Sequence, residues 1–376
     1  MWSRFLWAFG LTALTGLAGC LLLILLVDPL GVSPIGVISK PGYAVSDRRF
    51  VAPQIIASGD FDSFLVGTST IHHVDPATAN SALGGRFATV AIHGGTPYEL
   101  TKMMQLIGRN APHAKRIIIG VDARRWCKTE PYAQYNPKVL FPDWLYDESR
   151  VNDFQGLLNL KMVGYSVRQF KIAAGWRAPL IPATGYSNSL VDSRWSLSTA
   201  RKNLYKKHKK DAAAHGLDDA DEAADTEGKH DHPDLVSLDR ALTALPAQAD
   251  VILVVMPSHF TALLNKDRSD IERCKREIAA LVDKRHGTMI DFRIDSAWTR
   301  NDENFFDENH FRVGLAEALI KRVKQAMDQK QDAEDGVYRL LAGGKACPAT
   351  PMPGSVLHRG DDVGLNDAFD RRNLLQ

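Results

Sequence analysis

The chain has few cysteines and almost no excess charge, and each shortage excludes a class of protein. Four cysteines are spread over 376 residues without CxxC spacing, so neither a zinc site nor a dense disulfide framework is predicted. One disulfide bridge can still form, for example between Cys127 and Cys274, but the sequence does not select the pairing. The formal net charge is only +2, whereas a nucleic-acid-binding face needs concentrated basic charge. With 45% hydrophobic residues, the composition is that of a globular protein that does not bind nucleic acid.

The N-terminus holds the longest apolar run. Residues 5–27 carry no charged side chain, and about 20 apolar residues suffice for a helix to cross the hydrocarbon core of a membrane. A cleaved secretory signal has a shorter apolar core. The stretch "LAGC" at residues 17–20 resembles a lipoprotein cleavage box, but the apolar run continues past Cys20. We therefore expect residues 1–30 to form a retained membrane anchor, with cleavage as the alternative.

The basic residues that flank this span do not settle its orientation. Arg4 precedes it, while Lys40, Arg48 and Arg49 follow it, so the count of basic residues does not favour a cytoplasmic N-terminus. The main domain is placed outside the cytoplasm on the function inferred below.

An α/β fold is predicted from short apolar runs that alternate with helical patterns. Runs rich in β-branched residues are typical of strands covered on both faces. Amphipathic helices are expected near residues 97–109 and 313–327. This alternation favours a three-layer α/β/α fold with a parallel sheet of about five strands. The five predicted strands are 63–67, 86–92, 116–121, 250–256 and 287–292.

Two regions do not fit this core. Residues near 201–234 pass from a basic block to an acidic block with few large apolar side chains, which is typical of a solvated insertion. Residues 329–376 are rich in Gly, Pro and Asp without periodicity, and we expect a tail of low structural content. The α/β domain is therefore assigned to residues 40–328.

Three residues carry a pattern that indicates nucleophilic chemistry. Ser69 follows the first predicted strand in "LVGTST", and Asp307 and His310 lie three residues apart in "FFDENHFR". At that spacing a carboxylate can accept a hydrogen bond from one imidazole nitrogen, and the other nitrogen can then act as the base for a serine. Carboxyl ends of parallel strands share one sheet edge, so we expect Ser69, Asp307 and His310 to meet there.

These motifs resemble the SGNH hydrolase superfamily, in particular its membrane-anchored branch. That branch includes the SGNH-like proteins of alginate O-acetylation and the D-alanyl-transfer protein of Gram-positive envelopes. The resemblance rests on the N-terminal span followed by "DPLG", on "LVGTST", "AIHGGTPYEL" and "RIIIGVD", and on "FFDENHFR". It covers residues 60–125 and 250–327.

The resemblance implies roles for individual residues. Ser69 would be the nucleophile, His310 the base and Asp307 the residue that orients it. The backbone N–H of Gly94 or Gly95 would form an oxyanion hole together with that of Ser69.

One position departs from the superfamily pattern. An asparagine usually follows the third strand as an oxyanion donor, but this chain has Asp122, and a carboxylate only accepts hydrogen bonds. Asp122 is therefore expected to orient another group or to bind a sugar hydroxyl. His72 and His73 are candidates for substrate contact, with exposed helix positions as an equally good interpretation.

The leading functional hypothesis is an envelope-facing acyltransferase that moves a small acyl group, most plausibly acetyl, onto a polysaccharide or glucan hydroxyl. The mechanism requires no metal or organic cofactor. The resemblance implies a multispanning membrane O-acyltransferase as the acyl donor, and a location in the cytoplasmic membrane with the domain in the periplasm. One alternative is an esterase of carbohydrate or lipid with the same triad. Another is a glycan-binding or assembly protein with a degenerate site, which Asp122 makes plausible.

Overall fold

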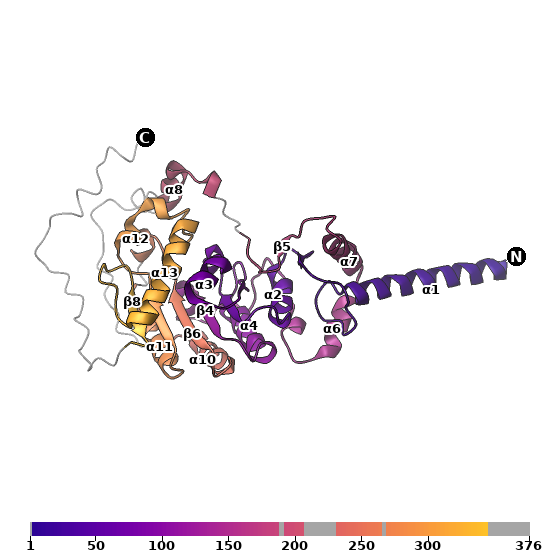
Figure 1. Cartoon of the computed structure of the whole chain (residues 1–376), viewed down its shortest axis with the longest axis horizontal. Coiled ribbons are helices and arrows are strands. Elements are labelled where there is room, and N and C mark those ends of the chain that lie inside the picture. Colours follow the sequence, from indigo (N-terminus) through magenta and orange to yellow (C-terminus); the bar gives the residue numbers. More distant parts are fainter. Residues whose placement is uncertain (1, 188–191, 207–230, 265–267, 345–376) are drawn as a thin grey trace, which may run out of the picture. The chain divides into compact units, whose positions relative to one another are not determined.

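The computed structural model describes residues 2–187, 192–206, 231–264 and 268–344, and within them a six-stranded sheet forms the centre (Figure 1). The strand order is β3-β2-β4-β6-β7-β8. The first five strands run parallel, and β8 is antiparallel to β7. The strands are β2 (Ser63–Val66), β3 (Phe87–Thr89), β4 (Arg116–Val121), β6 (Asp250–Val255), β7 (Thr288–Asp291) and β8 (Arg339–Ala342).

The mixed α/β class and the mostly parallel sheet are confirmed, and each of the five predicted strands is present. The sixth strand, β8, arises from residues that the sequence analysis assigned to the tail. Its pairing with β7 depends on contacts distant in sequence, because the Arg339 guanidinium reaches the buried Asp291 carboxylate at 2.8 Å. Residues 345–376 of the predicted tail, and 207–230 of the predicted insertion, lie outside the described residues.

Helices pack on both faces of the sheet because successive strand residues point to opposite sides. On one face, Phe64 and Val66 pack in a core cluster with α2 (Arg48–Ala57), α4 (Pro97–Asn110), α10 (Asp234–Ala244) and α11 (Arg268–Asp283). On the other face, Leu65 packs with α3 (Pro76–Leu83), α8 (Leu197–Leu204) and α13 (Val313–Gln329).

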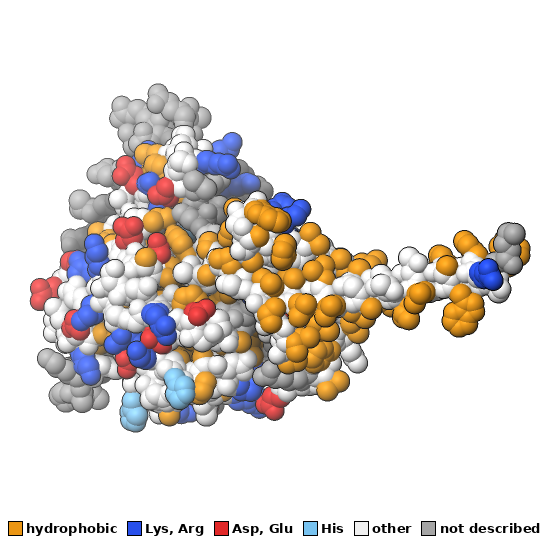
Figure 2. Space-filling model, turned by 45° about the vertical axis from the view of Figure 1, so that its right-hand side comes forward, with side chains coloured by type: hydrophobic (Ala, Val, Ile, Leu, Met, Phe, Trp, Pro, Cys, Tyr) orange, Lys and Arg blue, Asp and Glu red, His pale blue; other side chains and the backbone are white. Residues whose placement is uncertain are grey.

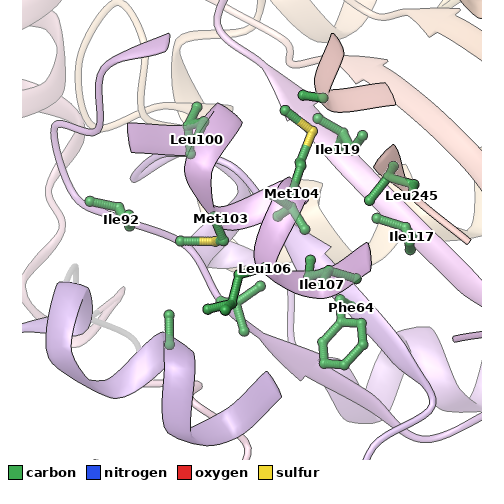
Figure 3. Close-up of a cluster of buried hydrophobic side chains, with 14 of the residues drawn as sticks. Phe64, Ile92, Leu100, Met103, Met104, Leu106, Ile107, Ile117, Ile119 and Leu245 are labelled. Atoms are coloured by element: carbon green, nitrogen blue, oxygen red, sulfur yellow. The ribbon is translucent and has the colours of Figure 1, made fainter. Parts of the chain in front are cut away.

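The α4 helix shows how the sequence pattern produces this packing. Thr96 and Glu99 form a capping box that satisfies backbone N–H groups at its first turn. Four apolar residues at helical spacing are buried against the strands, as Figure 3 shows. They are Leu100, Met103, Met104 and Ile107.

The remaining elements lie at the periphery of the sheet. The short strands β1 (Gly42–Tyr43) and β5 (Ile181–Pro182) pair antiparallel. The other helices are α1 (Trp2–Val27), α5 (Ala123–Trp126), α6 (Arg150–Leu157), α7 (Leu160–Ala173) and α12 (Ala297–Arg300). Single-turn 3₁₀ helices are η1 (Ile71–His73), η2 (Asp143–Leu145), η3 (Asp192–Arg194), η4 (Phe260–Leu263) and η5 (Asp302–Asn304).

Among the described residues, α1 is the one helix long and apolar enough to cross a membrane. Residues 2–20 are exposed, whereas Ile24 and Val27 are buried against the domain. The predicted apolar helix is therefore present, and its last turns belong to the folded domain.

The cysteine pairing that the sequence left open is Cys127 with Cys274, whose Cα atoms lie 5.5 Å apart. This disulfide joins the end of α5 to α11. Because α5 follows β4 at the carboxyl edge of the sheet, the bridge fixes the residues that border the candidate site.

Candidate active site

Ser69 lies in the turn that follows β2, where two features of the backbone require glycine. Gly67 has a φ of +152°, and a Cβ atom there would lie 2.8 Å from the carbonyl oxygen of Gly120 in β4. The hydroxyl-bearing neighbours Thr68 and Thr70 are buried, whereas Ser69 is half-buried. The chain thus leaves the sheet sharply and presents the Ser69 hydroxyl as the accessible one of the three.

Ser69, His310 and Asp307 form a continuous hydrogen-bonded chain. The Ser69 Oγ lies 2.9 Å from His310 Nε2. His310 Nδ1 lies 2.9 Å from each oxygen of the Asp307 carboxylate. When Nδ1–H donates to Asp307, Nε2 holds a lone pair that can accept the serine proton. The three residues that the sequence analysis singled out are therefore brought together, from positions up to 241 residues apart in the chain.

The Asp307 carboxylate is held in its charged form. Burial raises its pKa, but the hydrogen bond and charge of His310 oppose this, together with the backbone N–H groups of Asn309 and His310, and the net pKa is lowered. Those two N–H groups donate to Oδ1 at 2.9 and 3.0 Å. An ionised acceptor fixes the imidazole orientation and favours an imidazolium when the serine proton arrives.

The loop that carries Asp307 and His310 is fixed by a bridge between its two ends and by a hydrogen bond from the segment after β6. Phe305 and Phe311 are buried and pair as an antiparallel bridge. The His259 N–H, after β6, donates to the Glu308 carbonyl at 2.9 Å. Residues that follow the neighbouring strands thus hold the base in place.

Of the two predicted oxyanion donors, the structure favours Gly94. The Gly95 N–H donates to the Ile92 carbonyl at 3.0 Å, which closes a turn. Gly94 has a φ of +63°, and within the described part of the chain its N–H makes no hydrogen bond. Glycine permits this conformation at low cost.

The loop that carries Gly94 is positioned by an ion pair that sequence reasoning missed. Arg49 on α2 donates to both carboxylate oxygens of the buried Glu99, at 3.0 and 2.8 Å. The same guanidinium lies 3.4 Å from the carbonyl oxygen of His93. Arg49 and Glu99 are 50 residues apart, and no local pattern marks such a pair.

Asp122 orients another residue, as one of its two predicted roles requires. Its carboxylate accepts from Arg125 Nε at 2.9 Å. The Arg125 guanidinium also donates to the Tyr132 hydroxyl at 2.9 Å and to the Gly94 carbonyl at 3.5 Å. Asp122 therefore acts on the Gly94 loop through Arg125. Its other predicted role, contact with a sugar hydroxyl, stays a prediction.

The exposed positions considered for His72 and His73 are wrong, since their side chains are 0% and 1% exposed. The His72 ring lies 4.7 Å from that of His93, between centroids. Burial, followed by the nearby charges of Arg48 and His93, lowers the pKa of His72 to about 2. Contact between His72 and a substrate therefore needs an opening of this packing, and it stays a prediction.

His93 is a further histidine of the site that the sequence analysis did not select. Burial, the Arg48 charge and then His310 lower the pKa of His93 to about 4, so its imidazole is neutral at neutral pH. The sequence signal that could have identified His93 is its position directly before Gly94 and Gly95, the two predicted oxyanion donors.

The described residues contain no group of three or more His, Cys, Asp or Glu side chains that could hold a metal ion. No protein-family model and no curated protein matches this chain.

Proposed function

We propose that this protein is a membrane-anchored serine acyltransferase that faces the cell envelope and moves a small acyl group, acetyl, onto a polysaccharide or glucan hydroxyl. The observation that carries the proposal is the hydrogen-bonded chain from Ser69 through His310 to Asp307. A binding module with a degenerate site has no need of this alignment, so the geometry supports an enzyme.

The proposed reaction has two balanced steps. The Ser69 oxygen attacks the acyl carbonyl of the donor while His310 takes the serine proton, and that proton then passes to the departing donor group. An acceptor hydroxyl next attacks the acyl-serine. His310 takes the hydroxyl proton and returns it to Ser69, which frees the ester product.

Backbone N–H groups of Ser69 and Gly94 are proposed to stabilise the negative oxygen that develops in both steps. Loss of one such donor costs about 3–4 kcal/mol in comparable enzymes. The Arg49–Glu99 pair and the Asp122–Arg125 pair support this role, because both reach carbonyl groups of the loop that carries Gly94.

Membership of the SGNH superfamily, with its three-layer α/β/α fold, is part of the proposal. It is supported by the parallel sheet with helices on both faces and by a nucleophile after β2. It is also supported by an Asp-x-x-His motif that follows the last parallel strand, β7.

The proposed location is the cytoplasmic membrane, with the domain in the periplasm. The apolar helix α1 supports the anchor. The Cys127–Cys274 bridge supports an oxidising compartment, since disulfides are rare in cytosolic proteins. A membrane-embedded O-acyltransferase is proposed as the donor, because an acyl group made inside the cell has to cross the bilayer to reach Ser69.

The test is the intact mass of the full chain in mild detergent after brief exposure to p-nitrophenyl acetate. We expect one acetyl adduct that maps to Ser69, its absence in Ser69→Ala, and slow formation in His310→Ala. Acceptor glycans are then added to the acetylated protein. Transfer of the label to glycan supports the transferase, whereas release of acetate at the same rate with and without glycan identifies an esterase. A wild-type chain that forms no adduct and releases p-nitrophenol no faster than the variants overturns the enzyme proposal.

A further inference from the structure

The helix α7 leaves large apolar side chains exposed in addition to the apolar residues that it packs inward, Met162 and Ile172, whereas a surface helix usually exposes polar side chains. Ser166 and Gln169 are fully buried, and the Gln169 amide bonds the backbone of Ala44 and Gly42 at 2.9 Å. Val167 and Phe170 on the other side are more than 40% exposed. Val167 and Phe170 do not pack in the core, so the exposure of these apolar side chains requires another explanation.

The exposed apolar residues continue beyond the end of α7. Phe170 and Trp176 are in edge-on ring contact at 5.9 Å, and Trp176 is 73% exposed. We use the name α7 surface for five exposed residues: Leu160, Val167, Phe170, Trp176 and Leu180. Soluble domains rarely leave so many large apolar side chains uncovered in one segment.

The α7 surface adjoins the candidate membrane span. Helix α1 contacts α7, and the Val37 N–H donates to the carbonyl of Leu26, in the last turn of α1, at 2.9 Å. Val37 is itself 71% exposed. Figure 2 shows hydrophobic side chains gathered where α1 meets the domain.

The length of α1 places this junction at the membrane surface. Its fully exposed part, residues 2–20, is about 28 Å long at roughly 1.5 Å per residue. The hydrocarbon core of a bilayer is about 30 Å thick. If residues 2–20 cross that core, the buried turn around Ile24 and the adjoining α7 lie at the boundary between acyl chains and headgroups.

The charges near the α7 surface also favour contact with a membrane surface. Residues 154–187 contain Lys161, Arg168, Lys171 and Arg177 and no acidic residue. Basic residues beside large apolar side chains and a tryptophan are typical of segments that lie in the membrane interface. Basic residues near an anionic lipid surface are attracted to it.

We propose that the α7 surface is a second membrane contact, which lies in the headgroup region of an anionic phospholipid bilayer beside α1. This inference rests on the proposed membrane span and not on the acyl chemistry. The domain is thereby held against the bilayer at two points, which limits its rotation about the anchor.

The test uses the full chain with Cys20→Ser and Cys347→Ser, so that the introduced cysteine is the one outside the Cys127–Cys274 bridge and carries an NBD fluorophore. Val167→Cys reports on the α7 surface. Val236→Cys on α10, which is 58% exposed, is the matched control. Both are reconstituted in vesicles of phosphatidylethanolamine and phosphatidylglycerol, with and without doxyl-labelled acyl chains. We expect at least about twofold stronger doxyl quenching at position 167 than at 236, because contact with acyl chains requires insertion into the interface.

Equal quenching at the two positions, in chains that float with the vesicles, overturns the membrane contact and leaves the proposed function intact. The same result is expected if a protein partner normally covers the α7 surface. Failure of the chain to float with vesicles overturns both the anchor and this inference. Strong quenching at position 167 in a chain that forms no acetyl adduct supports the membrane contact and counts against the enzyme.

Discussion

Two aspartate–histidine pairs lie in the loops beyond β6 and β7, and only one of them has the geometry of a catalytic pair. His310 contacts Asp307 through one nitrogen and the Ser69 hydroxyl through the other. His259 contacts Asp302 through Nε2 at 3.1 Å, but its Nδ1 contacts the Thr261 hydroxyl at 2.9 Å. Each imidazole therefore has a carboxylate on one nitrogen and a hydroxyl on the other. The difference lies in whether that hydroxyl can reach a substrate.

Solvent access separates the pairs further. The His259 side chain is fully buried, whereas that of His310 is 28% exposed. Thr261 is buried as well, so a substrate carbonyl has no route to its hydroxyl, while Ser69 is half-buried at a strand end. An aspartate–histidine contact alone is therefore weak support for catalysis. The proposed role of His310 has the further support that its second nitrogen contacts the accessible hydroxyl of Ser69.

The largest predicted effect comes from neutralising each carboxylate in turn. Asp307→Asn is expected to lower the rate of Ser69 acetylation by about 10³-fold, because the neutral amide lacks the charge that fixes the imidazole tautomer and stabilises the imidazolium. Asp302→Asn is the matched control and is expected to stay within about threefold of wild type. Stopped-flow release of p-nitrophenol measures both rates. Equal losses in the two variants would contradict the assignment of roles.

When stability is measured in place of the acetylation rate, Asp302→Asn is expected to show the larger loss of the two variants. Asp302 accepts from His259, from Arg201 Nε at 2.7 Å and from the Tyr205 hydroxyl at 2.9 Å. Loss of these charged hydrogen bonds in Asp302→Asn is expected to cost about 2–3 kcal/mol of the free energy of unfolding. Urea denaturation in mild detergent at pH 7 measures this cost.

This contribution should depend on pH in a defined direction. Burial raises the pKa of Asp302, but hydrogen bonds from His259, Arg201 and Tyr205 outweigh it and lower the pKa to about 2. The stabilisation is therefore present above the unfolded pKa of about 4 and is lost as the pH falls toward 2. A wild-type advantage over Asp302→Asn that grows as the pH falls from 4 would refute this explanation.

His72 is buried without an aspartate partner among the residues that the structure describes. We therefore expect it to make the folded chain sensitive to acid at a higher pH than Asp302 does. His72 has a pKa lowered to about 2 by burial and by Arg48 and His93, so the unfolded chain takes up a proton below about pH 6.5 and the folded chain does not. Stability is then present above that pH and is lost as the pH falls through it. The expected loss from this residue between pH 7.5 and 5 is about 2 kcal/mol.

The variant His72→Gln tests this expectation, with the exposed His113→Gln as control. Urea denaturation at pH 7.5 and 5 should show a smaller loss of stability on acidification in His72→Gln alone. An unchanged loss in that variant would mean that other groups cause the acid sensitivity.

Local spacing made much of the architecture and the triad predictable. The strands that formed as predicted are continuous β-branched runs, and Asp307 with His310 share one short segment. The glycine turn after β2 marked Ser69 in the same way. Each of these signals lies within a few residues of chain, where sequence patterns are informative.

What escaped prediction depends on pairs distant in sequence. The strand β8 is four residues long, and its Arg339 has its partner Asp291 48 residues away. The Arg49–Glu99 pair and the His259–Asp302 pair are separated by 50 and 43 residues. Nothing local to these residues distinguishes them from ordinary charged or surface residues, and only the fold brings the partners together.

The smallest predicted effect concerns Asp122, which reaches the loop that carries Gly94 through Arg125. Arg125→Ala is expected to slow Ser69 acetylation by about tenfold, because small displacements of an oxyanion donor reduce the rate without removing it. Lys128→Ala is the matched control, since Lys128 lies over the same Tyr132 ring at 5.1 Å without a contact to Asp122.

A double-mutant cycle separates this indirect role from direct contact with the substrate. If Asp122 acts through Arg125, then Asp122→Ala gives a similar loss, and the double variant is no slower than either single variant. If Asp122 instead binds a sugar hydroxyl, Asp122→Ala leaves the acetylation rate unchanged, because no sugar takes part in the reaction with p-nitrophenyl acetate. The cycle therefore decides between the two roles that the sequence allowed for this carboxylate, with acetylation rate as the readout and Lys128→Ala as the baseline.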